Sequence, residues 1–221
     1  MIERASTLGL ELSLSRQDVL GFLGYPEDRA PPARIEALLE QALSEARALA
    51  RPRGAFAELG VDEAASIGLE PIAAERLVIG LVTAGAEIEE RAGALAKQGH
   101  ATWAVLMDAA GSAAAEEAAN RLGARIVEAA ARSPAALDVP CRLSPGYGRW
   151  TLASQPLLFA RLPHRDLGVE LLPSMLMVPR KSISFAMWLG AAERPAAGLA
   201  GCASCALETC RYRRKTKKET G

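Results

Sequence analysis

Residues 75–83 read Glu-Arg-Leu-Val-Ile-Gly-Leu-Val-Thr, an apolar run rich in β-branched side chains. A short continuous run of this kind is typical of a strand that is buried on both faces. Ala84-Gly85 follows directly, and the next residues have the pattern of a helix over about 86–97 that ends before Gly99. The sequence therefore predicts a central strand that turns at once into a helix.

The segment before this unit predicts a strand followed by a helix. Leucines alternate with small or polar residues over 8–14, which is typical of a half-buried strand. Ser15 stands three residues before Asp18, so it suits the N-cap of a short helix that ends at about Leu23.

The other patterns do not form a repeating strand–helix–strand series. They predict helices at about 33–50, 100–131 and 153–162, strands at about 168–172 and 181–189, and short strands within 55–74. This mixture favours an α+β domain over residues 1–194. Residues 195–221 are expected to be a linker, a cysteine motif and a basic tail.

Composition limits the classes of protein to be considered. The 221 residues carry no net charge, so no general affinity for nucleic acid is expected. No apolar stretch is long enough to cross a membrane, and the N-terminus lacks the pattern of a signal peptide. The four cysteines do not resemble a disulfide framework, which points to the reducing cytoplasm.

The segment Arg142-Leu-Ser-Pro-Gly-Tyr-Gly-Arg-Trp150 combines a guanidinium, a Pro-Gly bend and two aromatic residues. Arg142 offers a planar set of donors that suits a carboxylate, and Tyr147 offers an aromatic face to a cation. A ligand with both groups, such as S-adenosylmethionine, would fit. An ordinary turn with a solvated arginine is the alternative.

The C-terminal segment contains Cys202-x2-Cys205-x4-Cys210, and Cys141 could provide a fourth thiolate. Clustered thiolates suit zinc or an iron–sulfur cluster. A redox-active dithiol and an incidental cluster are the alternatives. The spacing differs from the C-x3-C-x2-C of radical S-adenosylmethionine enzymes.

Two further groups of polar residues attract notice. Asp108, Ser112 and Glu116 would lie on one face of a helix, either toward a ligand or, more often, toward solvent. Arg180 and Lys181 precede a strand and would contact an anion or serve as ordinary edge charges. The sequence has no phosphate-binding loop and only two histidines, so nucleotide hydrolysis and histidine-based catalysis are poorly supported.

Taken together, four segments resemble the S-adenosylmethionine-binding activation domain of cobalamin-dependent methionine synthase, in a free-standing form. They are residues 81–89, residues 106–116, the motif Arg142-x3-Gly146-Tyr147, and residues 168–184. The cysteine motif at 202–210 is similar to the tail of many free-standing members.

This resemblance implies an α+β fold with a bent central antiparallel sheet flanked by helices. It also implies reactivation of a corrinoid methyltransferase: an electron from flavodoxin or ferredoxin and a methyl group from S-adenosylmethionine convert cob(II)alamin to methylcobalamin. By the same resemblance Arg142 holds the ligand carboxylate, Ser144, Pro145 and Gly146 supply backbone contacts, and Tyr147 lies near the sulfonium or the corrin.

The chain lacks the D-x-H-x-x-G motif that binds cobalamin, so the corrinoid is expected on a partner, such as the core of a split methionine synthase. Two alternatives stay open at this point. One is an iron–sulfur protein that reduces a corrinoid protein without binding S-adenosylmethionine. The other is a docking module without catalytic activity that shelters a corrinoid face.

Overall fold

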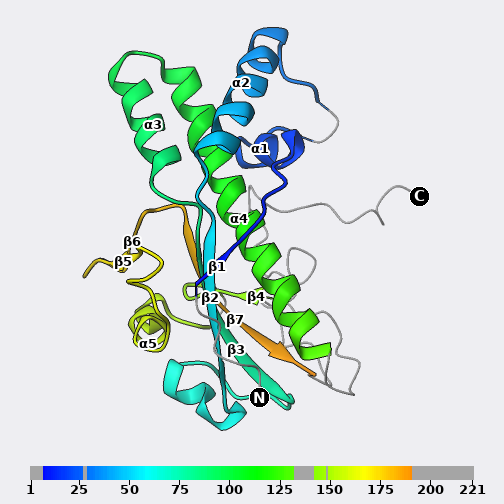
Figure 1. The fold of residues 1–221 in the computed structure, drawn as a ribbon, viewed down its shortest axis with the longest axis vertical. Coiled ribbons are helices and arrows are strands. Elements are labelled where there is room, and N and C mark those ends of the chain that lie inside the picture. Colours follow the sequence, from blue (N-terminus) through cyan, green and yellow to red (C-terminus); the bar gives the residue numbers. More distant parts are fainter. Residues whose placement is uncertain (1–6, 27–28, 132–141, 148, 191–221) are drawn as a thin grey trace.

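The structure, a computed structural model, describes residues 7–26, 29–131, 142–147 and 149–190 (Figure 1). At its centre β3 (Arg76–Thr83) pairs antiparallel with β7 (Ser182–Leu189) along the whole length of both strands. The outer strands of this five-stranded sheet are β1 (Leu8–Gly9), β2 (Arg53–Leu59) and β4 (Arg142–Leu143), in the order β1-β2-β3-β7-β4. All neighbours pair antiparallel, which confirms the α+β fold with a central antiparallel sheet.

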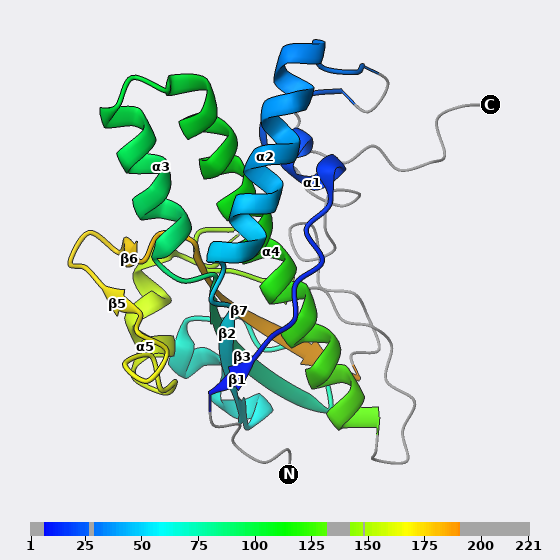
Figure 2. The same cartoon turned by 45° about the horizontal axis from the view of Figure 1, so that its top comes forward.

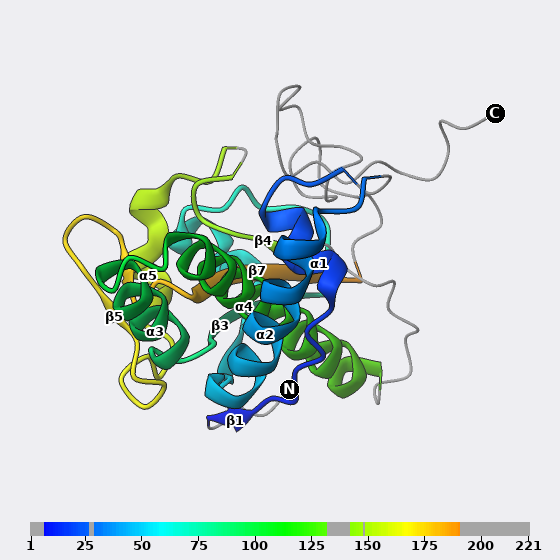
Figure 3. The same cartoon turned by 90° about the horizontal axis from the view of Figure 1, so that it is seen from above.

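The helices gather at one end of this sheet. They are α1 (Arg16–Phe22), α2 (Ala33–Leu49), α3 (Glu87–Lys97) and α4 (Ala101–Ala131). Figures 1 and 2 show α1, α2 and α3 standing around the first half of α4. Seen from above, α1 and α3 lie on opposite sides of α2 and α4 (Figure 3).

The helix α4 belongs to two layers, because it is long enough to leave the helical end and cross one face of the sheet. Its first half packs on the other helices through Met107 and a series of alanines. Its second half contacts the sheet through Leu122 and Ile126, which meet Val78 and Phe185. Alanines bring the helix axis close to both neighbours, so small side chains decide how α4 is placed.

The opposite face of the sheet is covered by short elements. These are the 3-10 helix η1 (Val61–Ile67), a 3-10 turn η2 (Leu152–Ser154) and α5 (Gln155–Phe159). Trp150, Leu158 and Phe159 pack there against the side chains of β3 and β7. A separate hairpin of β5 (Glu170–Leu171) and β6 (Met177–Val178) projects on the same side as α3.

Several predicted elements are shorter than expected or differ in kind. The strand predicted at 8–14 pairs only over Leu8–Gly9, because the chain then leaves the sheet edge and uses its alternating leucines to fill the core. The helix predicted at 153–162 is a 3-10 turn followed by the short α5, and the strand predicted at 168–172 is reduced to Glu170–Leu171. The segment 55–74 holds part of β2 and all of η1.

The other predictions are confirmed within a few residues, including the long α4 and the central pair of strands. Ser15 caps α1 as expected, since its hydroxyl accepts a hydrogen bond of 3.1 Å from the backbone N–H of Asp18. Among the described helices, none combines the length and the apolar character that a membrane span requires.

The pairing of β3 with β7 depends on a glycine. Gly80 lies opposite Phe185, and a Cβ at Gly80 would come within 2.5 Å of the Phe185 ring. The ring fills the space that the missing side chain leaves, so glycine and phenylalanine act here as one unit of packing.

Replacing Gly80 with alanine should therefore lower the free energy of unfolding by about 1–3 kcal/mol, as expected for an overpacked core. Gly93→Ala is the matched control, because Gly93 lies on α3 with open space around its Cβ position. That substitution should raise stability by up to about 1 kcal/mol through helix propensity. Chemical denaturation of both variants tests the packing, and equal effects would contradict it.

Candidate functional site

One face of α4 carries the polar residues Asp108, Ser112, Glu116 and Asn120, spaced four residues apart. We call these four residues the α4 seam. Side chains at this spacing lie on one side of a helix. The seam faces two cations, Lys181 at the start of β7 and Arg142 on β4, and it contacts both.

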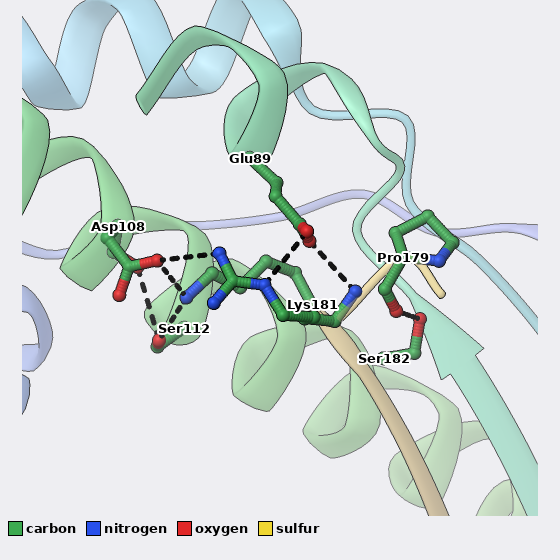
Figure 4. A network of polar contacts seen from close by, with 7 residues as sticks. Glu89, Asp108, Ser112, Pro179, Lys181 and Ser182 are labelled. Atoms are coloured by element: carbon green, nitrogen blue, oxygen red, sulfur yellow. Dashed lines mark hydrogen bonds and ion pairs between the residues drawn. The ribbon is translucent and has the colours of Figure 1, made fainter. Parts of the chain in front are cut away.

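Lys181 is the buried member of this group. Its Nζ donates to the hydroxyl of Ser112 at 2.9 Å and lies 2.8 Å from the carboxylate of Asp108 (Figure 4). Lys181 is 7% exposed, whereas the Asp108 side chain is 48% exposed. Gly111 leaves room for the lysine side chain, because a Cβ there would lie 3.1 Å from the lysine Cε.

Arg180 extends the network from α4 to α3. Its Nε donates to Glu89 at 2.9 Å, its backbone N–H donates to the other carboxylate oxygen of Glu89, and its Nη2 lies 3.7 Å from Asp108. The hydrogen bond that Arg180 donates to Glu89 raises the pKa of Arg180 above its ordinary value. In Figure 4 the side chains of two helices and of the segment before β7 converge on one polar cluster.

Arg142 occupies the far end of the seam. Its Nη2 donates to the carboxylate of Glu116 and, at 2.8 Å, to the amide oxygen of Asn120. Its guanidinium carbon lies 5.6 Å from the centre of the Phe185 ring. The Arg142 side chain is 18% exposed, so the guanidinium is largely surrounded by protein and keeps a limited opening to solvent.

The residues after Arg142 form a tight turn. The N–H of Tyr147 donates to the carbonyl of Ser144 at 3.1 Å, and Gly146 adopts φ +95° as the Pro-Gly bend requires. Trp150 anchors the turn, since its indole N–H donates to the carbonyl of Ile67 at 2.8 Å. Tyr147 is 64% exposed, so the turn presents an aromatic ring at the surface.

Arg142 therefore lies on β4, and Ser144, Pro145, Gly146 and Tyr147 follow it in the turn, where their roles in binding stay predictions. The structure changes the interpretation of the other polar groups. The stripe on α4 is partly exposed to solvent, and its residues also bind Lys181 and Arg142. Lys181 is no edge charge, since it is buried beneath α4.

Sequence reasoning missed the contacts of Asn120 and Glu89, and it gave Trp150 no anchoring role. Extending the four-residue spacing of the seam by one step would have found Asn120. Glu89 contacts Arg180 across 91 positions of sequence, and no local pattern predicts such a contact. The four cysteines, including Cys141 and the motif Cys202, Cys205 and Cys210, lie outside the described residues. Within those residues no cluster of histidines, cysteines and acids is suited to a metal ion.

Comparisons with known proteins give one informative result. No family model matches the chain, and no curated protein sequence is significantly similar to it. Among solved structures, the crystal structure of the MetH reactivation domain bound to AdoHcy aligns with a TM-score of 0.62. The alignment covers 91% of this chain and 84% of that one, at 17% sequence identity. The chain therefore has the fold of the MetH reactivation domain, as the sequence motifs suggest.

The contact between Lys181 and Asp108 should stabilise the fold measurably. In a double-mutant cycle of Lys181→Met and Asp108→Asn, we expect a coupling free energy of about 1–2 kcal/mol, because the lysine is buried and also bound to Ser112. The control cycle uses Arg121→Met and Glu117→Gln, an exposed pair one turn apart on α4, and should give about 0.3–0.5 kcal/mol. Couplings of equal size, measured by urea denaturation, would show that the lysine is no more than a surface charge.

Proposed function

We propose that this chain binds S-adenosylmethionine and reactivates a corrinoid-dependent methyltransferase, as the activation subunit of a split methionine synthase. The corrinoid belongs to the partner, and a flavodoxin- or ferredoxin-type reductant supplies the electron. The observation that carries the proposal is the position of Arg142 on the edge strand β4, followed by a tight turn that exposes Tyr147, in a fold shared with a domain crystallised with AdoHcy.

The chemistry of Arg142 fits the carboxylate of the ligand. A guanidinium has five N–H donors, and within the described part of the chain its hydrogen bonds leave only from Nη2. Nε and Nη1 face different sides of the guanidinium, so a ligand carboxylate would accept a single charge-assisted hydrogen bond from one of them. Glu116 and Asn120 would meanwhile hold the guanidinium in one orientation.

The charge of the neighbouring groups narrows the class of ligand. Glu116 neutralises much of the Arg142 charge, so a simple anion gains little there. A ligand that carries an ammonium beside its carboxylate satisfies both residues, and the methionine end of S-adenosylmethionine has both groups. The exposed ring of Tyr147 would face the sulfonium or the flat corrin of the partner.

The reaction places few demands on acids and bases. Bound S-adenosylmethionine would supply an activated methyl group and be left as S-adenosylhomocysteine, and the reductant would supply the one electron that the cob(II) state of the partner requires before the transfer. The protein must bind and orient the donor and let the partner approach. The site has an arginine, a tyrosine and backbone groups, which are sufficient for that task. The cysteine motif at 202–210 remains a predicted zinc or iron–sulfur site.

Binding of the ligand tests the role of Arg142 directly. Arg142→Ala should weaken S-adenosylmethionine binding by about 1.5–3 kcal/mol, the range for losing hydrogen bonds to a charged group. Arg149→Ala is the matched control, because Arg149 lies in the same segment with its side chain 93% exposed, and it should change binding by less than about 0.5 kcal/mol. Isothermal titration calorimetry gives both values. Unchanged affinity in the first variant would remove Arg142 from the site.

Reactivation is tested with the partner present. The protein, a corrinoid methyltransferase held in the cob(II) state, a low-potential reductant and S-adenosylmethionine should together form methylcobalamin, followed by its absorption spectrum. Tyr147→Leu should slow this step more than Tyr147→Phe, because phenylalanine keeps the aromatic face. Methylcobalamin formation at the same rate without the protein would count against reactivation, even if the ligand binds.

A further inference from the structure

A small cavity lies apart from the turn at 142–147 and from the α4 seam. It has a volume of about 230 Å³ and lies where the start of β2 and the end of β3 meet the first turn of α3. Arg53, Glu87 and Glu90 line it together with Gly85 and Gly168. None of the lining residues belongs to the turn or to the seam, so this cavity is separate from the site proposed above.

Arg53 brings an unsatisfied positive group to this cavity. Its Nε is buried and has no hydrogen-bond partner within the described part of the chain. Its Nη1 reaches the carbonyl of Asp166 only at 3.5 Å, the limit for such a bond. A buried Nε is out of reach of a ligand, so Nη1 and Nη2 are the donors that an oxygen in the cavity would meet.

Glu90 brings an opposite charge that Arg53 does not satisfy. Its side chain is exposed, and it forms no ion pair with any residue that the structure describes. Arg53 and Glu90 both line the cavity, yet their charged atoms lie beyond the 4.0 Å that defines an ion pair. The second acid, Glu87, also lines the cavity, and its carboxylate lies 3.9 Å from Nε of Arg51.

Two glycines with positive φ make room for these charges. A Cβ at Gly168, where φ is +67°, would lie 3.3 Å from Nη2 of Arg53. A Cβ at Gly85, where φ is +91°, would lie 2.6 Å from the carboxylate of Glu87. The wall therefore lacks a side chain beside the arginine and beside one of the acids, which leaves space next to each charge.

These features select the chemistry of the occupant. A simple anion would meet two carboxylates, and a simple cation would meet an arginine. A zwitterion avoids both penalties, because its carboxylate faces Arg53 and its ammonium faces Glu90. The volume is below the roughly 300–1,000 Å³ of pockets for drug-sized ligands, so the occupant is small.

We propose that this cavity binds the amino and carboxylate groups of a free α-amino acid. An adjoining groove of about 460 Å³ shares Arg53 and Glu87 with the cavity and is also lined by Ala50, Arg51 and Pro52. It offers the amino-acid side chain a place to extend, with the aliphatic part of that side chain against Ala50 and Pro52. The proposal stands independently of S-adenosylmethionine binding at Arg142.

The test begins with the full chain and each of the standard L-amino acids at millimolar concentration, with thermal stabilisation as the readout. The best ligand is then titrated by calorimetry, beside its amide, which lacks the carboxylate, and its deaminated acid, which lacks the ammonium. We expect binding of the amino acid and a loss of about 10-fold or more in affinity for both analogues, since each removes one charged partner.

Variants then locate the site. Arg53→Met and Glu90→Gln should each weaken amino-acid binding by about 10-fold or more. Glu90 is exposed, so Glu90→Gln should leave the stability of the fold unchanged. Arg121→Met on α4 is the control for loss of a surface cation and should leave the affinity unchanged. Arg149→Ala, in the segment of the proposed S-adenosylmethionine site, should also leave it unchanged.

Three outcomes would overturn the proposal. They are the absence of binding by every amino acid in the panel, binding of the amide or the deaminated acid as tight as that of the amino acid itself, and unchanged affinity in both Arg53→Met and Glu90→Gln. If the protein binds an amino acid but does not bind S-adenosylmethionine, the proposal for this cavity is supported and the proposed function is contradicted.

Discussion

The ion pairs that join α4 to the sheet set the geometry of the rest of this molecule. An alanine-rich helix packs closely, but alanines alone do little to choose one rotation of the helix about its axis. Asp108 with Lys181, and Glu116 with Arg142, act with the buried Met107, Leu122 and Ile126 to fix that rotation, because both acids lie on the same face of α4. The same contacts place β4 and the start of β7 beneath the helix, and so position the turn that follows Arg142.

Arg142 consequently has a structural role as well as the proposed binding role. Contacts with Glu116, Asn120 and Phe185 hold its guanidinium before any ligand arrives. A group that is already ordered loses less conformational entropy on binding than a free surface arginine does. A ligand carboxylate must, however, compete with the carboxylate of Glu116, which already lies beside the guanidinium. This balance favours a zwitterionic ligand over a simple anion.

The sequence predicted those parts of the structure that depend on local pattern. The apolar run at 75–83, the capped α1 and the long α4 all follow from periodicity and propensity. The segment at Arg142 stands out by its residue types, and its predicted binding role comes from its resemblance to a family. The short β1 could not be predicted, because the same leucine alternation serves a paired strand and an extended segment packed on the core. The contact of Lys181 with Ser112 joins residues 69 positions apart, and only the sheet topology brings them together.

The low identity with the MetH reactivation domain has a physical explanation that also indicates where function resides. A core tolerates many apolar exchanges as long as volume and pattern are kept, so a fold persists at 17% identity. Recognition of a charged ligand is less tolerant, because it requires a particular donor at a particular place. In this chain the exposed Tyr147 adds little to the core, whereas Arg142 serves both the packing of α4 and the turn. A change at Tyr147 therefore separates function from stability more cleanly than a change at Arg142, whose loss would disturb the helix and the ligand together.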